Sequence, residues 1–185
     1  MGEIKYGQIR GTEVGFPLNM GASETFYSKS GRFVTNDASG RGELAGAAST
    51  ALQGFVREGQ PDNGAGSGGF TTSTTEGADI FHCITDLTAV FRLPLAYDNS
   101  TYDRNYSTAL NGELCDLVVV NGVQYVNLST SLRDIIRIVG GKASTVAGGV
   151  AFAAGMTAAV TGLCLGDGYV DVQMVSGTLY GLGVE

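Results

Sequence analysis

The sequence has little charge, one histidine and no long apolar run. Charged residues make up 16% of the 185 positions, whereas about 25% is usual for a globular protein. No apolar run reaches the roughly 18 residues that a helix needs to cross a bilayer. The first residues also lack the basic and then apolar pattern of a secretory signal peptide. We therefore expect a soluble protein without a membrane partner, made in a reducing compartment.

Cysteine is also scarce. The three cysteines, Cys83, Cys115 and Cys164, are far apart in the chain, and each is set among apolar residues. A disulfide framework would need an even number of cysteines, and a zinc site would need close pairs of ligands. The pattern instead predicts buried thiols that pack as small apolar side chains, with no metal bound.

Basic residues are too few for a protein that binds nucleic acid. The chain has 11 Lys and Arg against 18 Asp and Glu, with a net charge of -7 and an isoelectric point near 4.6. Affinity for a phosphate backbone comes mainly from Lys and Arg, so nucleic acid is not expected as a partner. Residues 1–41 hold five basic and four acidic side chains, so an almost neutral segment precedes an acidic remainder.

Glycine, in contrast, is abundant, with 29 residues in the chain. It is costly inside helices and suits tight turns, so this composition favours a β protein rich in turns. The clearest turn is Asn121-Gly122, which separates two runs of β-branched and aromatic residues at 114–120 and 123–128. A type I′ turn needs positive φ at both central positions, which Asn and Gly tolerate. The sequence therefore predicts a β-hairpin centred on these two residues.

Further short apolar runs lie between turn residues along the rest of the chain. Residues 132–139 fit either a helical turn or a strand, and Gly140-Gly141 is expected to end it. Near the C-terminus, Val170, Val172 and Met174 alternate with polar residues, which places them on one face of a strand. Eight or more such strands predict an all-β fold, as an antiparallel β-sandwich or barrel.

Residues 1–45 lack a sustained hydrophobic period because glycines break them into short pieces. They are nevertheless richer in apolar and aromatic residues than a disordered tail. Such a segment becomes ordered by lying either on its own subunit or on a neighbour, and the sequence leaves both open. We expect an extended N-terminal arm over 1–45 and a β-sandwich or barrel body over 46–185, with a flexible loop near 59–78.

No catalytic constellation is evident. The single histidine, His82, lies in an apolar run without a nucleophile elbow, which favours a core or edge position. Residues 64–69 lack the Gly-Lys-Ser/Thr ending of a phosphate-binding loop. Residues 98–105 lack the glycine and the closing glutamate of a calcium loop. We therefore expect no catalytic residue, no cofactor and no enzyme activity.

Four segments of the chain carry a family resemblance. They are Met1 to Arg10, the element Gly15-Phe16-Pro17-Leu18, the run Gly112 to Gly122 and the segment Gly166 to Val172. Together they resemble the capsid decoration, or cement, proteins of tailed bacteriophages. The resemblance implies a β-rich virion structural protein, often a homotrimer, that binds the outside of a capsid and reinforces it without catalysis. The implied partner is the major capsid protein, and the implied location is the capsid surface after synthesis in the host cytoplasm.

The arm is the expected capsid-binding part of such a protein. It is rich in apolar side chains and poor in net charge, and a subunit held at several points gains avidity without one strong contact. The expected capsid contacts of the arm are Tyr6, Ile9, Phe16, Leu18, Phe26 and Phe33.

Two functions of other classes compete with capsid binding. The first is a carbohydrate-binding or receptor-binding head-fibre module. Its platform would consist of Tyr97, Asp98, Tyr102, Asp103 and Tyr106. The second is a hydrolase whose site assembles from His82 and partners that are distant in sequence, since the members of a catalytic triad converge only in space.

Overall fold

The structure is a computed structural model of the chain. It describes residues 7–27, 30–57, 69–94, 106–120, 122–127, 133–143 and 168–175. Within these ranges the regular structure consists of β-strands and one 3-10 turn, η1 (Thr108–Leu110). None of the described residues forms a helix long and apolar enough to cross a membrane.

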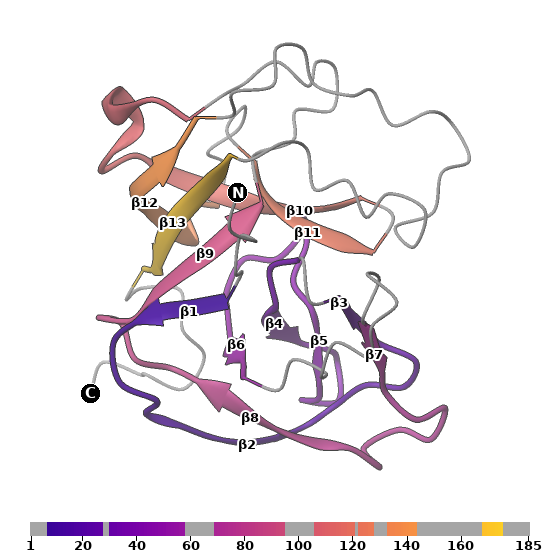
Figure 1. Cartoon of the computed structure of the whole chain (residues 1–185). Helices are drawn as coiled ribbons and strands as arrows, with labels where there is room; N and C mark the ends of the chain where they lie inside the picture. Colours follow the sequence, from indigo (N-terminus) through magenta and orange to yellow (C-terminus); the bar gives the residue numbers. More distant parts are fainter. Residues whose placement is uncertain are drawn as a thin grey trace.

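The strands form three antiparallel sheets (Figure 1). The largest sheet contains, in spatial order, β1 (Gly7–Arg10), β9 (Val90–Pro94), β13 (Tyr169–Met174), β12 (Ile136–Lys142), β10 (Leu114–Val120) and β11 (Val123–Asn127). The second sheet contains β2 (Gly15–Asn19), β8 (Ile80–Ile84), β6 (Gly54–Val56), β4 (Phe33–Asn36) and β5 (Gly42–Leu44). The third sheet pairs β3 (Thr25–Tyr27) with β7 (Gly69–Thr71).

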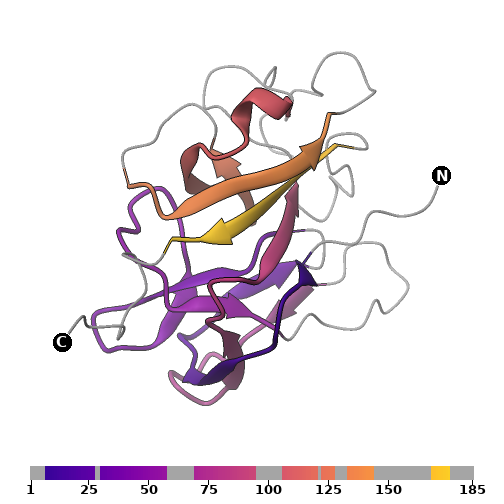
Figure 2. The same cartoon turned by 90° about the vertical axis from the view of Figure 1, so that its left-hand side faces the viewer.

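The two larger sheets pack face to face as the layers of a β-sandwich, which Figure 2 shows from the side. The main core lies between them and contains residues of both sheets, such as Phe55 and Ile84 from one and Val170 and Val172 from the other. The predicted all-β antiparallel sandwich is therefore confirmed. Within the described residues the sheets keep separate edge strands, so the alternative of a closed barrel is not what forms.

Three phenylalanines occupy the centre of the main core. The ring centroids of Phe33 and Phe55 are 5.0 Å apart, those of Phe33 and Phe91 are 5.2 Å apart, and those of Phe55 and Phe91 are 4.4 Å apart. All three side chains are buried. Since Phe91 comes from the six-stranded sheet and the other two from the five-stranded sheet, this cluster holds the two layers together.

A second core lies on the opposite face of the five-stranded sheet. The β3–β7 pair covers this face, because Phe26 of β3 and Phe70 of β7 both contact Phe81 of β8, with ring centroids 6.0 and 4.9 Å apart. Leu18 of β2 and Val56 of β6 are buried in the same cluster. The five-stranded sheet is thus buried on both faces over much of its area.

The hairpin that the sequence predicts is present. Strands β10 and β11 are paired, with Val120 opposite Val123, so two residues connect them, and Gly122 has a φ of 79°. The predicted end of the next strand at Gly140-Gly141 is wrong. Both glycines lie inside β12, which continues to Lys142, and a bulge falls between Ile138 and Gly140. A bulge accommodates glycine within a strand, which is why the pair does not end it.

The segment expected to be an arm contributes strands to all three sheets. Of residues 1–45, those that the structure describes contribute strands β1 to β5. Strand β1 pairs with β9, β2 pairs with β8, and β4 pairs with β6. The boundary at residue 45 therefore does not separate an arm from a body, because strands from both sides of it share the same hydrogen-bonded sheets.

Part of the loop expected near 59–78 is regular structure. Residues 69–71 form β7, which pairs with β3, and Thr72 is buried. The Thr72 hydroxyl donates to the Gly21 carbonyl at 2.7 Å and accepts from the Glu24 N–H at 2.7 Å. Backbone pairing and the hydrogen bonds of the Thr72 hydroxyl fix residues 69–72 in place. Residues 58–68 lie outside the described part of the chain.

A buried glutamine joins the two layers along one side of the sandwich. Gln124 Nε2 donates to the carbonyl oxygens of Phe33 (2.9 Å) and Ala45 (2.7 Å), and Gln124 Oε1 accepts from the Phe33 N–H (2.9 Å). The Gln124 N–H donates to Ser30 Oγ at 2.7 Å, and its carbonyl accepts from the Gly31 N–H at 3.0 Å. The amide side chain therefore acts as an additional peptide group between β11 and β4.

Candidate functional site

The six residues expected to contact a capsid lie in different environments. Leu18, Phe26 and Phe33 are buried in the two cores, so in this fold they present no surface to a partner. Phe16 is partly buried and packs against the second core. Ile9 is 41% exposed, and Tyr6 lies outside the described residues. The structure therefore leaves Ile9 as the one clearly exposed side chain among the five that it describes.

Exposed apolar side chains identify a more specific surface. In the described part of the chain, the large hydrophobic residues that are exposed are Ile9 (41%), Val14 (62%) and Ile80 (62%). Ile9 lies in β1 and Val14 directly precedes β2, where the chain crosses from the edge of one layer to the edge of the other. We call residues 9–14 the β1–β2 corner. Ile80 lies at the far end of β8, opposite Asn19 of β2.

A carboxylate fixes the β1–β2 corner to the turn between β8 and β9. Asp86 Oδ2 accepts from the hydroxyl of Thr12 (2.5 Å) and from its N–H (2.9 Å). Asp86 Oδ1 accepts from the hydroxyl (2.7 Å) and the N–H (2.8 Å) of Thr88. These bonds, led by those of the Thr12 and Thr88 hydroxyls, hold the pKa of the Asp86 carboxyl well below its ordinary value.

The stabilisation that Asp86 gives the β1–β2 corner should decrease in acid. Because the folded-state pKa of Asp86 lies below its ordinary value of 3.8, the stabilisation is present above pH 3.8 and disappears as the pH falls through the folded pKa. Asp86→Asn should lower the thermal midpoint by a few degrees at pH 7, and the difference from the unmodified protein should shrink in acid. Thermal unfolding followed by circular dichroism from pH 7 to pH 2 measures this.

Glu13→Gln is the matched control for that measurement. The Glu13 carboxylate makes one exposed ion pair with Arg57 at 3.1 Å, so its loss should leave the pH dependence unchanged. If the thermal midpoints of the Asp86→Asn protein and the unmodified protein differed by the same amount at every pH, the Asp86 charge would not be what holds the corner.

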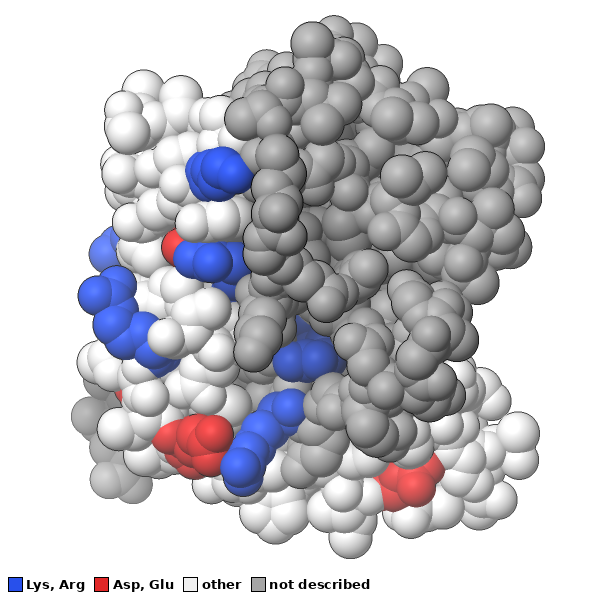
Figure 3. Space-filling model, in the orientation of Figure 1, with Lys and Arg blue, Asp and Glu red and all other residues white. Residues whose placement is uncertain are grey.

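Basic side chains gather on the outer face of the six-stranded sheet. Phe91, Val170 and Val172 point into the core, so the residues that alternate with them point outward. The outward cations are Arg10 of β1, Arg92 of β9, and Arg137 and Lys142 of β12. We call these four residues the basic face. Figure 3 shows Lys and Arg in blue over the region where Figure 1 places β1, β9, β12 and β13.

The Asp171 carboxylate of β13 lies beside Arg92 of the basic face. Arg92 donates from Nε to Asp171 Oδ1 at 2.8 Å and from Nη2 to Asp171 Oδ2 at 2.9 Å. The guanidinium also lies 3.5 Å from the centroid of the Tyr169 ring. This bidentate and stacked arrangement fixes the Arg92 side chain on the outer surface of β9 and β13.

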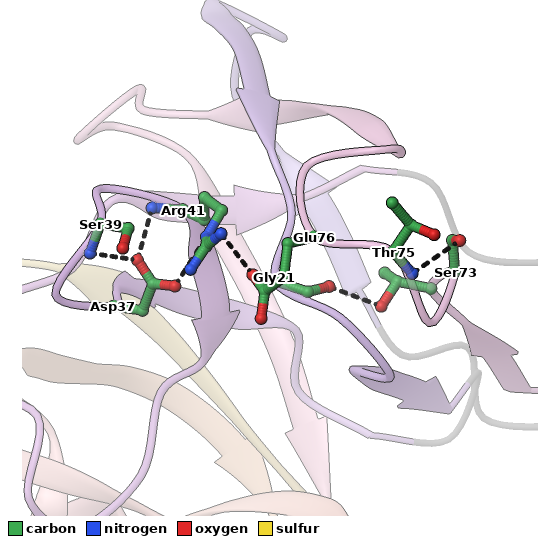
Figure 4. A network of polar contacts seen from close by, with 8 residues as sticks. Gly21, Asp37, Ser39, Arg41, Ser73, Thr75 and Glu76 are labelled. Carbon is green, nitrogen blue, oxygen red and sulfur yellow. Dashed lines mark hydrogen bonds and ion pairs between the residues drawn. The ribbon is translucent and has the colours of Figure 1, made fainter.

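Acidic side chains gather in another part of the molecule, on the five-stranded sheet. Asp37 pairs with Arg41 Nε at 2.9 Å, and Arg41 Nη1 pairs with Glu76 Oε2 at 2.6 Å (Figure 4). Burial raises the pKa of Glu24, and the nearby carboxylates of Glu43, Asp37 and Glu76 add to that rise, whereas a hydrogen bond from the Leu44 N–H opposes it. We call Glu24, Asp37, Glu43 and Glu76, with Arg41 among them, the acidic end.

The histidine and two of the cysteines considered above for catalysis or metal binding lie in the described strands. His82 is partly exposed in β8, which lies between β2 and β6 rather than at a sheet edge, and its Nε2 lies 3.3 Å from the Glu13 carbonyl oxygen. Cys83 and Cys115 are buried as expected, and burial raises the pKa of the Cys115 thiol to about 12. No group of three or more His, Cys, Asp or Glu within the described ranges could hold a metal ion.

Of the five residues expected to form a carbohydrate platform, the structure describes Tyr106. Tyr106 is partly buried against the main core, and its hydroxyl donates to Asn111 Oδ1 at 2.9 Å. Its ring therefore has a packing role in the sandwich. Tyr97, Tyr102 and the neighbouring Asp98 and Asp103, like Cys164, lie outside the described part of the chain.

Reasoning from the sequence missed the basic face. Its four cations are spread over residues 10 to 142 and come together only because β1, β9, β13 and β12 are neighbours in one sheet. Alternation within 136–142 could have placed Arg137 opposite to Ile136 and Ile138, but not beside Arg10 or Arg92.

Comparisons of the chain with protein-family models, with curated proteins and with solved structures gave no match. Function is therefore proposed from the residues and geometry of this chain and from the resemblance noted in its sequence.

Proposed function

We propose that this chain is a structural protein of a bacteriophage virion, which binds the outer surface of the capsid and stabilises the shell without catalysing a reaction. The partner is the major capsid protein, and the assembled form is a homotrimer. The proposal rests on the resemblance of four segments to decoration proteins. The observation that directs it to a surface is the exposed apolar pair Ile9 and Val14 at the β1–β2 corner.

The corner has the properties of a docking element. Ile9 and Val14 expose apolar surface, whose removal from water on binding is favourable. Asp86 and Ala89 hold the loop that carries Val14: Asp86 through Thr12, and Ala89 through close packing on Gly11. A loop fixed in this way loses little conformational freedom on binding, so more of the contact energy appears as affinity.

Point substitutions are needed to test this function, because deletion of residues 1–45 would remove β1, β2, β4 and β5 from the sandwich and β3 from the third sheet. The double variant Ile9→Asp/Val14→Asp places charge on both apolar side chains of the corner. We expect the unmodified protein to co-sediment with purified expanded capsid shells of its virus up to saturation. The double variant should bind at least about tenfold more weakly, because each buried carboxylate carries a desolvation cost.

Ile80→Asp is the matched control, since Ile80 is 62% exposed, as is Val14, but lies at the far end of β8. It should co-sediment as the unmodified protein does. Failure of the unmodified protein to pellet with shells would remove the proposed function. Equal binding by the double variant would leave the function in place and show that the corner is not the contact.

A further inference from the structure

The charge of this chain is separated within the fold. The basic face lies on the outer surface of the six-stranded sheet, where Arg10 lies in β1 and Arg137 in β12, both exposed. Within the described part of this sheet, Asp171 of β13 lies among these cations and pairs with Arg92. The whole chain nevertheless carries a net charge of -7, so this face has the opposite sign to the rest of the molecule.

The acidic end lies on the other layer. Asp37 and Arg41 belong to the turn between β4 and β5, Glu43 lies in β5, and Glu76 lies between β7 and β8. Among the described residues, the Arg41 guanidinium pairs with two of the four carboxylates, Asp37 and Glu76. The described carboxylates of this end therefore outnumber its described cation. Burial is the main cause of the raised pKa of Glu24, and the carboxylates of Glu43, Asp37 and Glu76 add to it.

We propose that the basic face of one copy of this chain binds the acidic end of a second copy. The two surfaces have opposite charge and lie on different layers, so the basic face of one copy cannot contact the acidic end of the same copy. The contact is heterologous, and contacts of this kind close into a ring when the rotation between copies allows it. Since the proposal concerns contacts between copies, it goes beyond the proposed shell binding and does not depend on it.

The net charge of -7 does not prevent this contact. At physiological ionic strength, charges separated by more than about 8 Å are largely screened. The charges that lie directly across the interface therefore decide whether two copies associate. This reasoning also predicts that the association weakens as salt is raised.

The mass in solution tests the proposal, by sedimentation equilibrium of the full chain. At about 50 mM salt the mass should be at least twice that of the 19.1 kDa chain, and it should fall toward the monomer at about 0.5 M salt. The variant Arg10→Glu/Arg137→Glu should be monomeric at low salt. So should Glu43→Lys/Glu76→Lys, which reverses the charge of the other surface.

An equimolar mixture of the two variants should restore association, because one intact basic face then meets one intact acidic end. Arg57→Glu is the control, since Arg57 is an exposed cation paired with Glu13 on the other layer, and it should leave the mass unchanged. Circular dichroism of each variant checks that it is folded. A monomer at low salt overturns the inference, as does an oligomer that both variants and salt leave unchanged. A monomer that still pellets with shells overturns it while supporting the proposed shell binding.

Discussion

Replacing Gln124 with leucine is expected to destabilise the protein by about 2–5 kcal/mol, because two buried backbone groups lose the side-chain amide that pairs with them. These groups are the Phe33 N–H and the Ala45 carbonyl, which lie 2.9 and 2.7 Å from the Gln124 amide. The Phe33 carbonyl keeps the Ala45 N–H as a partner at 2.9 Å, so it contributes less. Leucine has a similar volume but cannot form a hydrogen bond, so the loss reports these polar contacts.

Urea denaturation of the isolated protein measures this change, with the slope of the transition checked for two-state behaviour. Gln173→Leu is the matched control. Gln173 lies on the outer face of the same sheet, and its Nε2 makes one hydrogen bond to the Thr88 carbonyl at 3.1 Å. Its replacement should cost less than about 1 kcal/mol. Equal effects of the two substitutions would contradict the role assigned to Gln124 in joining the layers.

Replacing Phe33 with alanine is expected to cost about 3–5 kcal/mol of unfolding free energy, since it leaves a cavity among packed rings. Phe33 is buried, and its ring contacts both Phe55 of its own layer and Phe91 of the facing layer. The loss should appear in the isolated protein with no capsid present. This result would separate a core residue from the capsid contact that the sequence predicts at this position.

Ile9→Ala provides the comparison, because Ile9 is 41% exposed and belongs to the same segment. It should change stability by no more than about 0.5 kcal/mol, the usual range for surface positions. If Phe33→Ala left urea stability unchanged and instead weakened shell binding, Phe33 would be a surface contact and the packing described here would be wrong.

The β1–β2 corner and the basic face overlap at Arg10, and the apolar Ile9 of the corner lies directly beside it. Ile9 belongs to the corner and Arg10 to the basic face, and both lie in the edge strand β1. An apolar contact at one and an ionic contact at the other would differ in salt dependence, because screening weakens only the second. Shell binding that resists salt, together with self-association that does not, would therefore match the two proposals.

Local features of the fold were predictable because they depend on neighbouring residues. The two-residue connection between β10 and β11 follows from the dihedral angles that Asn121-Gly122 tolerates. The burial of Val170, Val172 and Met174 follows from alternation within one strand. The burial of Cys83 and Cys115 follows from their apolar neighbours. In each case the physical cause acts over a few residues, so the sequence alone contains it.

The sequence by itself determined an antiparallel β fold with this hairpin and these buried faces. Only the tertiary structure decided that the first 45 residues belong to the sheets, because β1 pairs with β9, which lies about 80 residues later. Phe33 and Phe91, and Arg10 and Arg137, are likewise brought together by pairing of distant strands. Such pairing depends on complementary packing between whole sheets and on closing long loops, and neither is encoded in a local pattern.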